Sequence, residues 1–299
     1  MREYNVFKNF VEKHLAVFLP ETYREARIEI FPVHKTNGLD YDGLTIRLGE
    51  NGAAPLLPMK PYYQQLCDGD TIDEVMQQIA KDYLAMLQNA TLDPEVPAFF
   101  EQQSILSWEK AKDHLGFHLL NPEKNEDRLR GKLYSKYLDL AKVYFLFWNR
   151  DGVIYSALIP QGLLEKWNVS MEELDREATE NMQKAFPREI GPLEPWPYVV
   201  IGEDPVLTIV TTEMYNFASS VLYDGVLEEL RDMLNEDYYL IPSSTEEFLV
   251  CPKRNQDPGF LRTVLRDINR EVVGEEIFLS DNLYEFTKES GKMQIVQIA

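Results

Sequence analysis

Residues 143–148, Val-Tyr-Phe-Leu-Phe-Trp, form the most hydrophobic segment of the chain. A strand with one face in water alternates apolar and polar residues, whereas a run without alternation is typical of a strand buried on both faces. Asp151-Gly152 follows as a turn signal, and a second apolar run covers residues 153–159. The sequence therefore predicts a hairpin whose first strand lies at the centre of a sheet.

An order of two strands and a helix recurs along the chain. The predicted strand pairs start near residues 28, 143, 206 and 238, at unequal intervals, so the chain is not a solenoid. The pair at 206 consists of residues 206–211 and 217–222, and the last two strands are expected at 283–286 and 293–298. Tight hairpins favour antiparallel pairing. The sequence predicts an α+β fold with mostly antiparallel sheets, built from strand-strand-helix units with helices packed on one face.

The chain divides most naturally near residue 98. An amphipathic helix at the start is followed by strands at 28–33 and 44–48, which flank the turn signal Asn37-Gly38. Thr71 or Asp70 can cap the next helix, and Thr91–Ala98, with two prolines, resembles a linker. We expect an N-terminal α-β-β-α region over residues 1–98 and a larger region of strand-strand-helix units over residues 99–299.

The chain is strongly acidic. Fifty Asp and Glu residues against thirty Lys and Arg residues give a formal net charge of −20. Such a charge repels phosphate backbones and anionic lipids, so general nucleic-acid binding and membrane binding are disfavoured. The acidic residues are spread along the whole sequence, which favours a solubilising surface over an acidic face that docks a basic partner or mimics DNA.

Cellular location follows from what the sequence lacks. Lys8, Glu12 and Lys13 interrupt the apolar residues near the N-terminus, which recur at helical spacing rather than forming a signal peptide. No apolar run reaches the roughly 18 residues that a membrane span requires. Cys67 and Cys251 have no metal-type spacing and fit a reducing compartment. We expect a cytoplasmic protein.

The common catalytic motifs are missing, and His114 and His118 are the candidates for a metal site. On a helix, four-residue spacing would place both imidazoles on one face. Gly116 and the apolar residues around it favour a strand instead, where the two rings would stand too far apart to chelate one ion alone. Ordinary hydrogen-bonded histidines are therefore expected, and no cofactor is predicted.

Two further segments offer candidate catalytic residues. Asp139 precedes the apolar strand, where burial would raise its pKa and suit a general acid or base, although a turn cap or a pair with Lys136 or Lys142 is the simpler interpretation. The segment 242–247, Pro-Ser-Ser-Thr-Glu-Glu, contains the hydroxyls of Ser243 and Ser244 beside Glu247. With no histidine nearby in sequence, a structural turn is expected there.

The segment Phe186–Pro205 is rich in prolines and also apolar, which indicates a structured loop or second linker. Trp196 and Tyr198 lie within it. Exposed aromatic side chains are enriched at binding surfaces, so these two residues are the candidates for contact with a partner.

Several short segments, taken in order, resemble a bacterial family catalogued as a domain of unknown function, DUF5688, from gram-positive gut anaerobes. They are Leu138-Asp-Leu-Ala141, Trp167 with Glu172-Glu-Leu174 and Asn181-Met182, Leu222-Tyr223 before Leu227, Ile241-Pro-Ser-Ser244 with Glu247, and Leu279-Ser-Asp281. The resemblance covers nearly the whole chain and implies a bacterial cytosolic protein. It brings no catalytic residues.

Two functions remain open on these residues. The leading hypothesis is a non-catalytic cytosolic protein that binds another protein or a peptide through an exposed sheet face or the Pro187–Pro205 loop. The alternative is a hydrolase that uses buried carboxylates, possibly with a metal. The preference for binding rests on the reactive side chains lying apart, and a hollow that gathers imidazole, carboxylate and hydroxyl groups would count against it.

Overall fold

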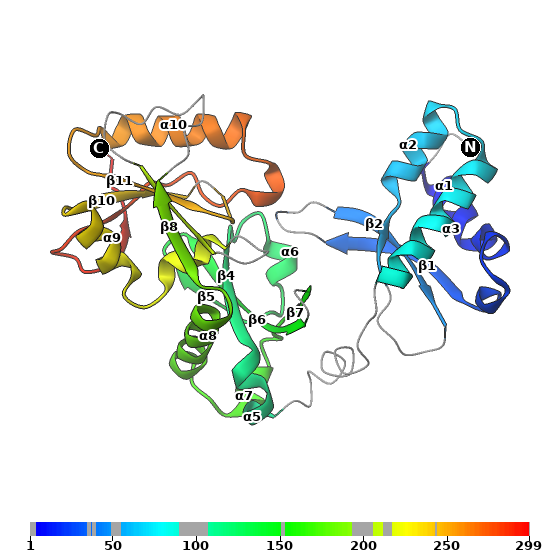
Figure 1. Cartoon of the computed structure of the whole chain (residues 1–299), viewed down its shortest axis with the longest axis horizontal. Coiled ribbons are helices and arrows are strands. Elements are labelled where there is room, and N and C mark those ends of the chain that lie inside the picture. Colours follow the sequence, from blue (N-terminus) through cyan, green and yellow to red (C-terminus); the bar gives the residue numbers. More distant parts are fainter. Residues whose placement is uncertain are drawn as a thin grey trace. The chain divides into compact units, whose positions relative to one another are not determined.

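The computed structural model describes residues 4–34, 37, 40–48, 55–89, 107–150, 153–192, 206–211, 217–242 and 244–298. The chain forms two compact units, whose elements are labelled in Figure 1. The first unit contains Met1–Lys35 and Leu39–Gln103, and the second contains Thr36–Gly38 and Ser104–Ala299. Each unit is described separately below.

The first unit combines helices with a small antiparallel sheet. Its elements are α1 (Tyr4–His14), 3-10 helices at Leu15–Phe18 and Glu21–Tyr23, β1 (Arg27–His34), β2 (Asp40–Arg47), β3 (Leu57–Pro58), α2 (Lys60–Asp68) and α3 (Ile72–Asn89). The sheet has the order β1-β2-β3. Phe7 and Val11 of α1, Leu44 of β2, and Ile79 and Tyr83 of α3 are fully buried in one hydrophobic core.

Two local signals near the start of the chain act as expected, at Asn37 of the second unit and at Thr71 of the first unit. Asn37 has a positive φ of 59°, which an Asn-Gly turn favours. Thr71 caps α3 reciprocally: its Oγ1 accepts from the backbone N–H of Glu74, and its own backbone N–H donates to the Glu74 carboxylate.

The second unit contains a four-stranded sheet centred on β6. Its strands are β4 (Leu115–Leu120), β5 (Tyr134–Tyr137), β6 (Leu140–Arg150) and β7 (Val153–Leu158). β6 pairs in antiparallel fashion with β4, β5 and β7. Residues Val143, Tyr144, Phe145, Leu146 and Phe147 of β6 are buried, so the prediction of a central strand is confirmed.

A six-stranded sheet completes the second unit. Its strands are β8 (Arg188–Pro192), β9 (Leu207–Thr211), β10 (Tyr238–Ile241), β11 (Phe248–Pro252), β12 (Tyr284–Phe286) and β13 (Met293–Ile295). Their order is β13-β12-β10-β11-β9-β8, and every pairing is antiparallel. The predicted α+β class with mostly antiparallel sheets is confirmed.

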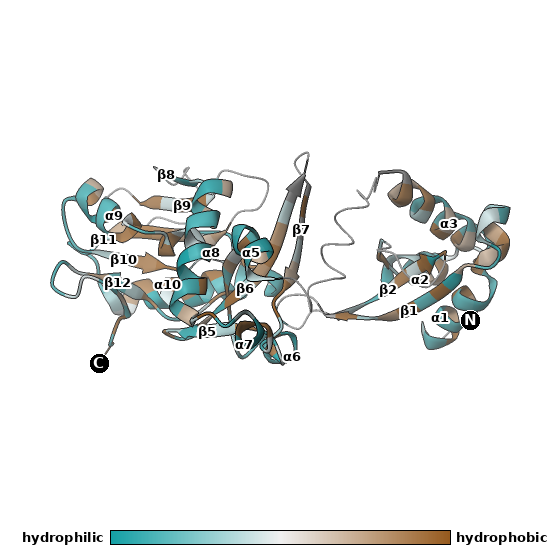
Figure 2. Ribbon diagram, turned by 90° about the horizontal axis from the view of Figure 1, so that it is seen from below, coloured by the Kyte–Doolittle hydropathy of each residue, from teal (hydrophilic) through white to brown (hydrophobic). Residues whose placement is uncertain are grey.

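The helices of the second unit supply the outer layers. They are α5 (Trp108–Ala111), α6 (Glu126–Leu129), α7 (Leu163–Trp167), α8 (Met171–Ala185), α9 (Val226–Leu234) and α10 (Pro258–Glu271), with 3-10 helices at Lys112–His114 (η5), Ala218–Leu222 (η6) and Glu275–Ile277 (η7). Figure 2 shows α8 and α10 as mostly hydrophilic ribbons, whereas strands β9, β10 and β11 contain many hydrophobic residues. The side chain of Ser170 accepts from the backbone N–H of Glu173 and caps the start of α8.

Helices contact both faces of the six-stranded sheet, which corrects the expectation of helices on one face. Leu261 and Leu265 of α10 pack with Tyr239 of β10. The neighbouring Tyr238 donates from its hydroxyl to the carbonyl of Leu227 in α9 at 2.8 Å. Successive strand residues point to opposite faces, so α9 and α10 lie on opposite sides of β10.

Two local predictions were wrong. Residues 217–222 were expected to form a strand, but Ala218–Leu222 is a 3-10 helix with buried Ala218 and Val221. Residues 186–205 were expected to form a structured loop or second linker, but Arg188–Pro192 is strand β8, paired with β9, and residues 193–205 lie outside the described residues. Pro192 sits at the end of a strand at the edge of the sheet, a position where a missing N–H is tolerated.

Candidate functional site

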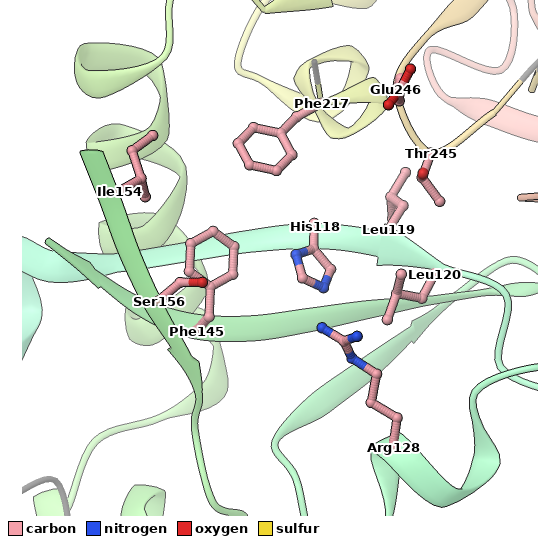
Figure 3. Close-up of a pocket in the computed structure, with 10 residues that line it drawn as sticks. All are labelled: His118, Leu119, Leu120, Arg128, Phe145, Ile154, Ser156, Phe217, Thr245 and Glu246. Carbon is pink, nitrogen blue, oxygen red and sulfur yellow. The ribbon is translucent and has the colours of Figure 1, made fainter. Parts of the chain in front are cut away.

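A pocket of about 310 Å³ lies within the second unit, beside the four-stranded sheet. It is lined by His118, Leu119 and Leu120 of β4, Phe145 of β6, Ile154 and Ser156 of β7, Arg128 of α6, Phe217, Thr245 and Glu246. Figure 3 shows these side chains around His118. Segments distant in sequence meet here because β6 pairs with both β4 and β7.

The register of the sheet directs His118 into the pocket. His118 is opposite Val143, and Phe145 is opposite Gly116, so the imidazole and the Phe145 ring project from the same face. Their centroids are 5.2 Å apart. The absence of a side chain at Gly116 leaves the room that the Phe145 ring fills, since a Cβ there would lie 2.8 Å from that ring.

The imidazole of His118 is held in its neutral form. Burial, followed by the nearby Arg128 guanidinium, lowers the pKa of His118 to about 3. The Nε2 atom is buried and has no hydrogen-bond partner among the residues that the structure describes. Nearly all buried polar atoms in proteins are paired, so this atom marks a place where a ligand group could bind.

Arg128 supplies positive charge to the same pocket. It belongs to α6, whose first turn is preceded by the buried Asn125, and in Figure 3 its guanidinium points toward His118. Burial lowers the pKa of Arg128, yet a guanidinium remains protonated in proteins. A planar guanidinium matches the geometry of a carboxylate or phosphate.

The remaining walls combine aromatic rings with a polar rim. Phe145 is buried and Phe217 is half-buried, with ring centroids 6.4 Å apart. Ser156 and Glu246 are exposed at the mouth, and Thr245 is half-buried. The pocket therefore offers one guanidinium and one neutral imidazole to a polar group, and aromatic and aliphatic surface to an apolar group.

The two histidines proposed as metal ligands do not share a site. Nδ1 of His114 donates to the carbonyl of Phe147 at 3.1 Å, and its ring stacks on Trp148 with centroids 4.6 Å apart. His114 does not line the pocket that contains His118. Within the described ranges, no group of three or more His, Cys, Asp or Glu side chains is arranged to hold a metal ion.

Asp139 lies in the turn between β5 and β6 and is engaged in hydrogen bonds. Its carboxylate accepts from the hydroxyl of Ser280 at 2.6 Å and from the side-chain amide of Asn282 at 3.0 Å. The hydroxyl of Tyr284 donates to it at 2.7 Å. These bonds join the β5–β6 turn to the segment that leads into β12. Asp139 does not line the pocket.

The hydroxyl segment between β10 and β11 forms a turn. The backbone N–H of Glu246 donates to Oγ of Ser244 at 3.0 Å, and the backbone N–H of Ser244 donates to the carbonyl of Glu247. This turn carries Thr245 and Glu246, which sequence reasoning did not select, into the pocket wall. Ser243 lies outside the described residues, as do Trp196 and Tyr198.

A second buried charged cluster was also missed by the sequence analysis. Lys142 of β6 is buried, forms an ion pair with Asp175 of α8, and lies over the Phe117 ring. Tyr144 donates from its hydroxyl to the same carboxylate at 2.7 Å. A signal was available, because Lys142 is a single cation at the start of a segment predicted to be buried on both faces.

Comparison with protein families connects this architecture to a group of sequences. The family of unknown function DUF5688 matches residues 4–288. The chain belongs to the DUF5688 family. The resemblance seen in the sequence is thereby confirmed, and the DUF5688 match covers most of both units and every residue that lines the pocket. Comparisons with curated proteins and with solved structures find no match.

Among the helices that the structure describes, none combines the length and the apolar character that a bilayer span needs.

Proposed function

We propose that this chain is a non-catalytic binding protein of the bacterial cytoplasm, and that its pocket binds a carboxylate joined to an apolar body. Small organic acids and the C-terminal residue of a peptide share this chemistry. The second source agrees with the protein or peptide partner expected from the sequence. General nucleic-acid binding stays disfavoured, because the net charge is −20.

The observation that carries the proposal is the buried, unpartnered Nε2 atom of His118 beside the Arg128 guanidinium. A buried polar atom without a partner costs about 1–3 kcal/mol. A carboxylate in the pocket would receive a hydrogen bond from Nε2–H and charge-assisted bonds from the guanidinium. The Nε2 atom would then have a hydrogen-bond partner, which it lacks among the described residues.

The surroundings of the Nε2 atom of His118 favour binding over hydrolysis as the function of the pocket. A nucleophilic hydroxyl needs a base within hydrogen-bond reach, and no described hydroxyl bonds to Nε2 of His118. A general base works best when its pKa lies near the operating pH, and that of His118 is lowered to about 3. The imidazole is therefore suited to hydrogen bonding and poorly suited to proton abstraction.

A hydrolase remains the second candidate because of what the pocket brings together. The preference for binding assumed that reactive side chains lie apart, yet an imidazole, the hydroxyls of Ser156 and Thr245, and the Glu246 carboxylate all line one hollow. Catalytic hydrogen bonds can tighten only when substrate binds. Turnover of an ester such as 4-nitrophenyl hexanoate, lost in His118→Gln, would favour this candidate.

The proposal is tested by calorimetric titration of the full chain with hexanoate and with a short peptide ending in leucine, as free acid and as amide. We expect the free acids to bind and the amides not to. Arg128→Gln should weaken binding at least about tenfold, since charged hydrogen bonds contribute about 1.5–3 kcal/mol. Arg130→Gln is the matched control, because Arg130 is exposed and pairs with Asp127 on the surface.

Each outcome has a defined meaning. Binding of the peptide acid alone identifies a peptide partner, and binding of both acids identifies a general carboxylate site. Equal binding of acid and amide, or an Arg128→Gln variant that binds like the unmodified chain, would show that the pocket does not recognise a carboxylate.

A further inference from the structure

We infer that the apolar body of the ligand is an aromatic ring, so that the pocket selects aromatic carboxylates over aliphatic carboxylates of the same size. The inference rests on the proposed function, since it describes the second half of a ligand whose carboxylate faces Arg128 and His118. It is carried by the arrangement of rings in the pocket wall.

Three rings lie next to one another in this wall. The centroids of His118 and Phe145 are 5.2 Å apart with planes inclined by 31°, and those of Phe145 and Phe217 are 6.4 Å apart with an inclination of 36°. Aromatic pairs in proteins prefer offset or tilted arrangements with centroids about 4.5–7 Å apart. Figure 3 shows the three rings on neighbouring sides of the pocket. A ligand ring would extend an aromatic cluster that already exists.

The rings are fixed before any ligand arrives. Phe217 contacts the buried Phe186 edge-on, with centroids 5.5 Å apart and planes at 81°. Phe186 in turn contacts Phe147 of β6 at 5.2 Å. A preformed wall does not lose side-chain freedom on binding, and a ligand ring has fewer torsions to immobilise than an alkyl chain. Both effects favour a rigid ring over a flexible aliphatic group.

The size of the pocket limits the ligand. Ligand pockets commonly measure about 300–1,000 Å³, so a volume of about 310 Å³ is at the small end of this range. One ring with a short acid arm fits such a volume. The ring would lie against Phe145 and Phe217, and the arm would place the carboxylate near Arg128.

The experiment compares two probes with the same acid arm, one carrying a planar aromatic ring and the other a puckered saturated ring. The full chain is titrated with 3-phenylpropanoate and with 3-cyclohexylpropanoate, which have the same number of non-hydrogen atoms and the same acid arm. Aromatic contacts contribute about 0.5–1.5 kcal/mol beyond burial of area, so we expect 3-phenylpropanoate to bind about three- to tenfold more tightly. Phe217→Leu removes one of the two phenylalanine rings that would contact the ligand ring and should lower this ratio, while Phe145 remains in the wall. Phe260→Leu, at an exposed position of α10, should leave the ratio unchanged.

The outcomes separate this inference from the proposed function. Equal affinity of the unmodified chain for the two probes overturns the aromatic selectivity and leaves carboxylate binding standing. Binding of neither probe overturns both proposals. The comparison on the unmodified chain is decisive even where Phe217→Leu folds poorly, and circular dichroism of the variant shows whether it has folded.

Discussion

The ammonium nitrogen of Lys142 lies 3.8 Å from the centre of the Phe117 ring. Phe117 is fully buried, so a charged group is held against the core of the second unit. The Asp175 carboxylate pairs with the ammonium, and Asp175 itself is partly exposed. Burial lowers the pKa of Lys142, although Asp175 and Asp224 act in the opposite direction. The charged ammonium of Lys142 therefore depends on the Asp175 carboxylate more than the ammonium of a surface lysine would depend on its partner.

Because the buried ammonium of Lys142 depends on the Asp175 carboxylate, substitutions of the two residues should change the free energy of unfolding by different amounts. Lys142→Met removes the charge and keeps most of the length of the unbranched side chain, so we expect a free energy of unfolding within about 1 kcal/mol of the original. Asp175→Ala leaves a buried ammonium without its carboxylate and removes the acceptor of Tyr144, so we expect a loss of about 2 kcal/mol. Urea unfolding followed by tryptophan fluorescence reports on the second unit, because all four tryptophans lie between residues 104 and 299. A larger loss in Lys142→Met than in Asp175→Ala would contradict the ion-pair interpretation.

Because the pKa of His118 is lowered in the folded chain, the free energy of unfolding should fall as the pH is lowered. Its pKa is about 3 in the folded chain, against an ordinary value of 6.5, so between these values the unfolded chain binds the proton and the folded chain does not. Lowering the pH from 6.5 toward 3 therefore favours unfolding, with a contribution of up to about 1.4 kcal/mol per pH unit. Above pH 6.5 this contribution to the pH dependence disappears.

The pH effect is checked by urea unfolding between pH 4 and pH 7. His118→Gln should show a shallower loss of stability than the unmodified chain. His14→Gln, at an exposed position of α1, should leave the slope as it is. Identical slopes for His118→Gln and the unmodified chain would show that His118 does not titrate in this way.

Loss of the negative charge of Asp139 should lower the free energy of unfolding. Asp139→Asn replaces an acceptor of three hydrogen bonds with a group that must also donate, so at least one of Ser280, Asn282 and Tyr284 loses its acceptor. We expect a loss of about 1–3 kcal/mol in the free energy of unfolding. Asp127→Asn provides the control, because Asp127 is exposed and pairs with Arg130 on the surface. A stability unchanged by Asp139→Asn would mean that these three bonds do not hold the β5–β6 turn.

The packing around Gly116 leaves no room for the methyl group of an alanine. A Cβ at Gly116 would lie 2.8 Å from two ring carbons of Phe145 and 2.9 Å from the sulfur of Met182. Gly116→Ala should therefore destabilise the second unit by about 1–3 kcal/mol through overpacking. Gly162→Ala has open space around the added carbon and should change stability by less than about 1 kcal/mol. Thermal unfolding of the two variants compares these positions directly, and equal melting temperatures would refute the packing argument.

Segments whose structure depends on near neighbours in the chain were predictable. The central strand around Phe145, the Ser170 cap of α8 and the left-handed turn at Asn37 all follow from side chains a few residues apart. β5 was not recognised, because Tyr134–Tyr137 is short and polar and becomes a strand only by pairing with β6. Strand β8 was hidden for the same reason, since its prolines indicated a loop and β9 provides the pairing.

The candidate site shows the same division. His118 was selected from the sequence as one of two metal candidates, but its role depends on Arg128, Phe145 and Phe217, which no local pattern connects to it. The amino-acid order alone establishes an acidic α+β chain, its strongest strands and helix caps, and its family, because these follow from composition and short-range geometry. Only the folded chain decides that the Nε2 atom of His118 is enclosed beside a guanidinium, because strand pairing joins distant segments and desolvation sets the charge of the imidazole.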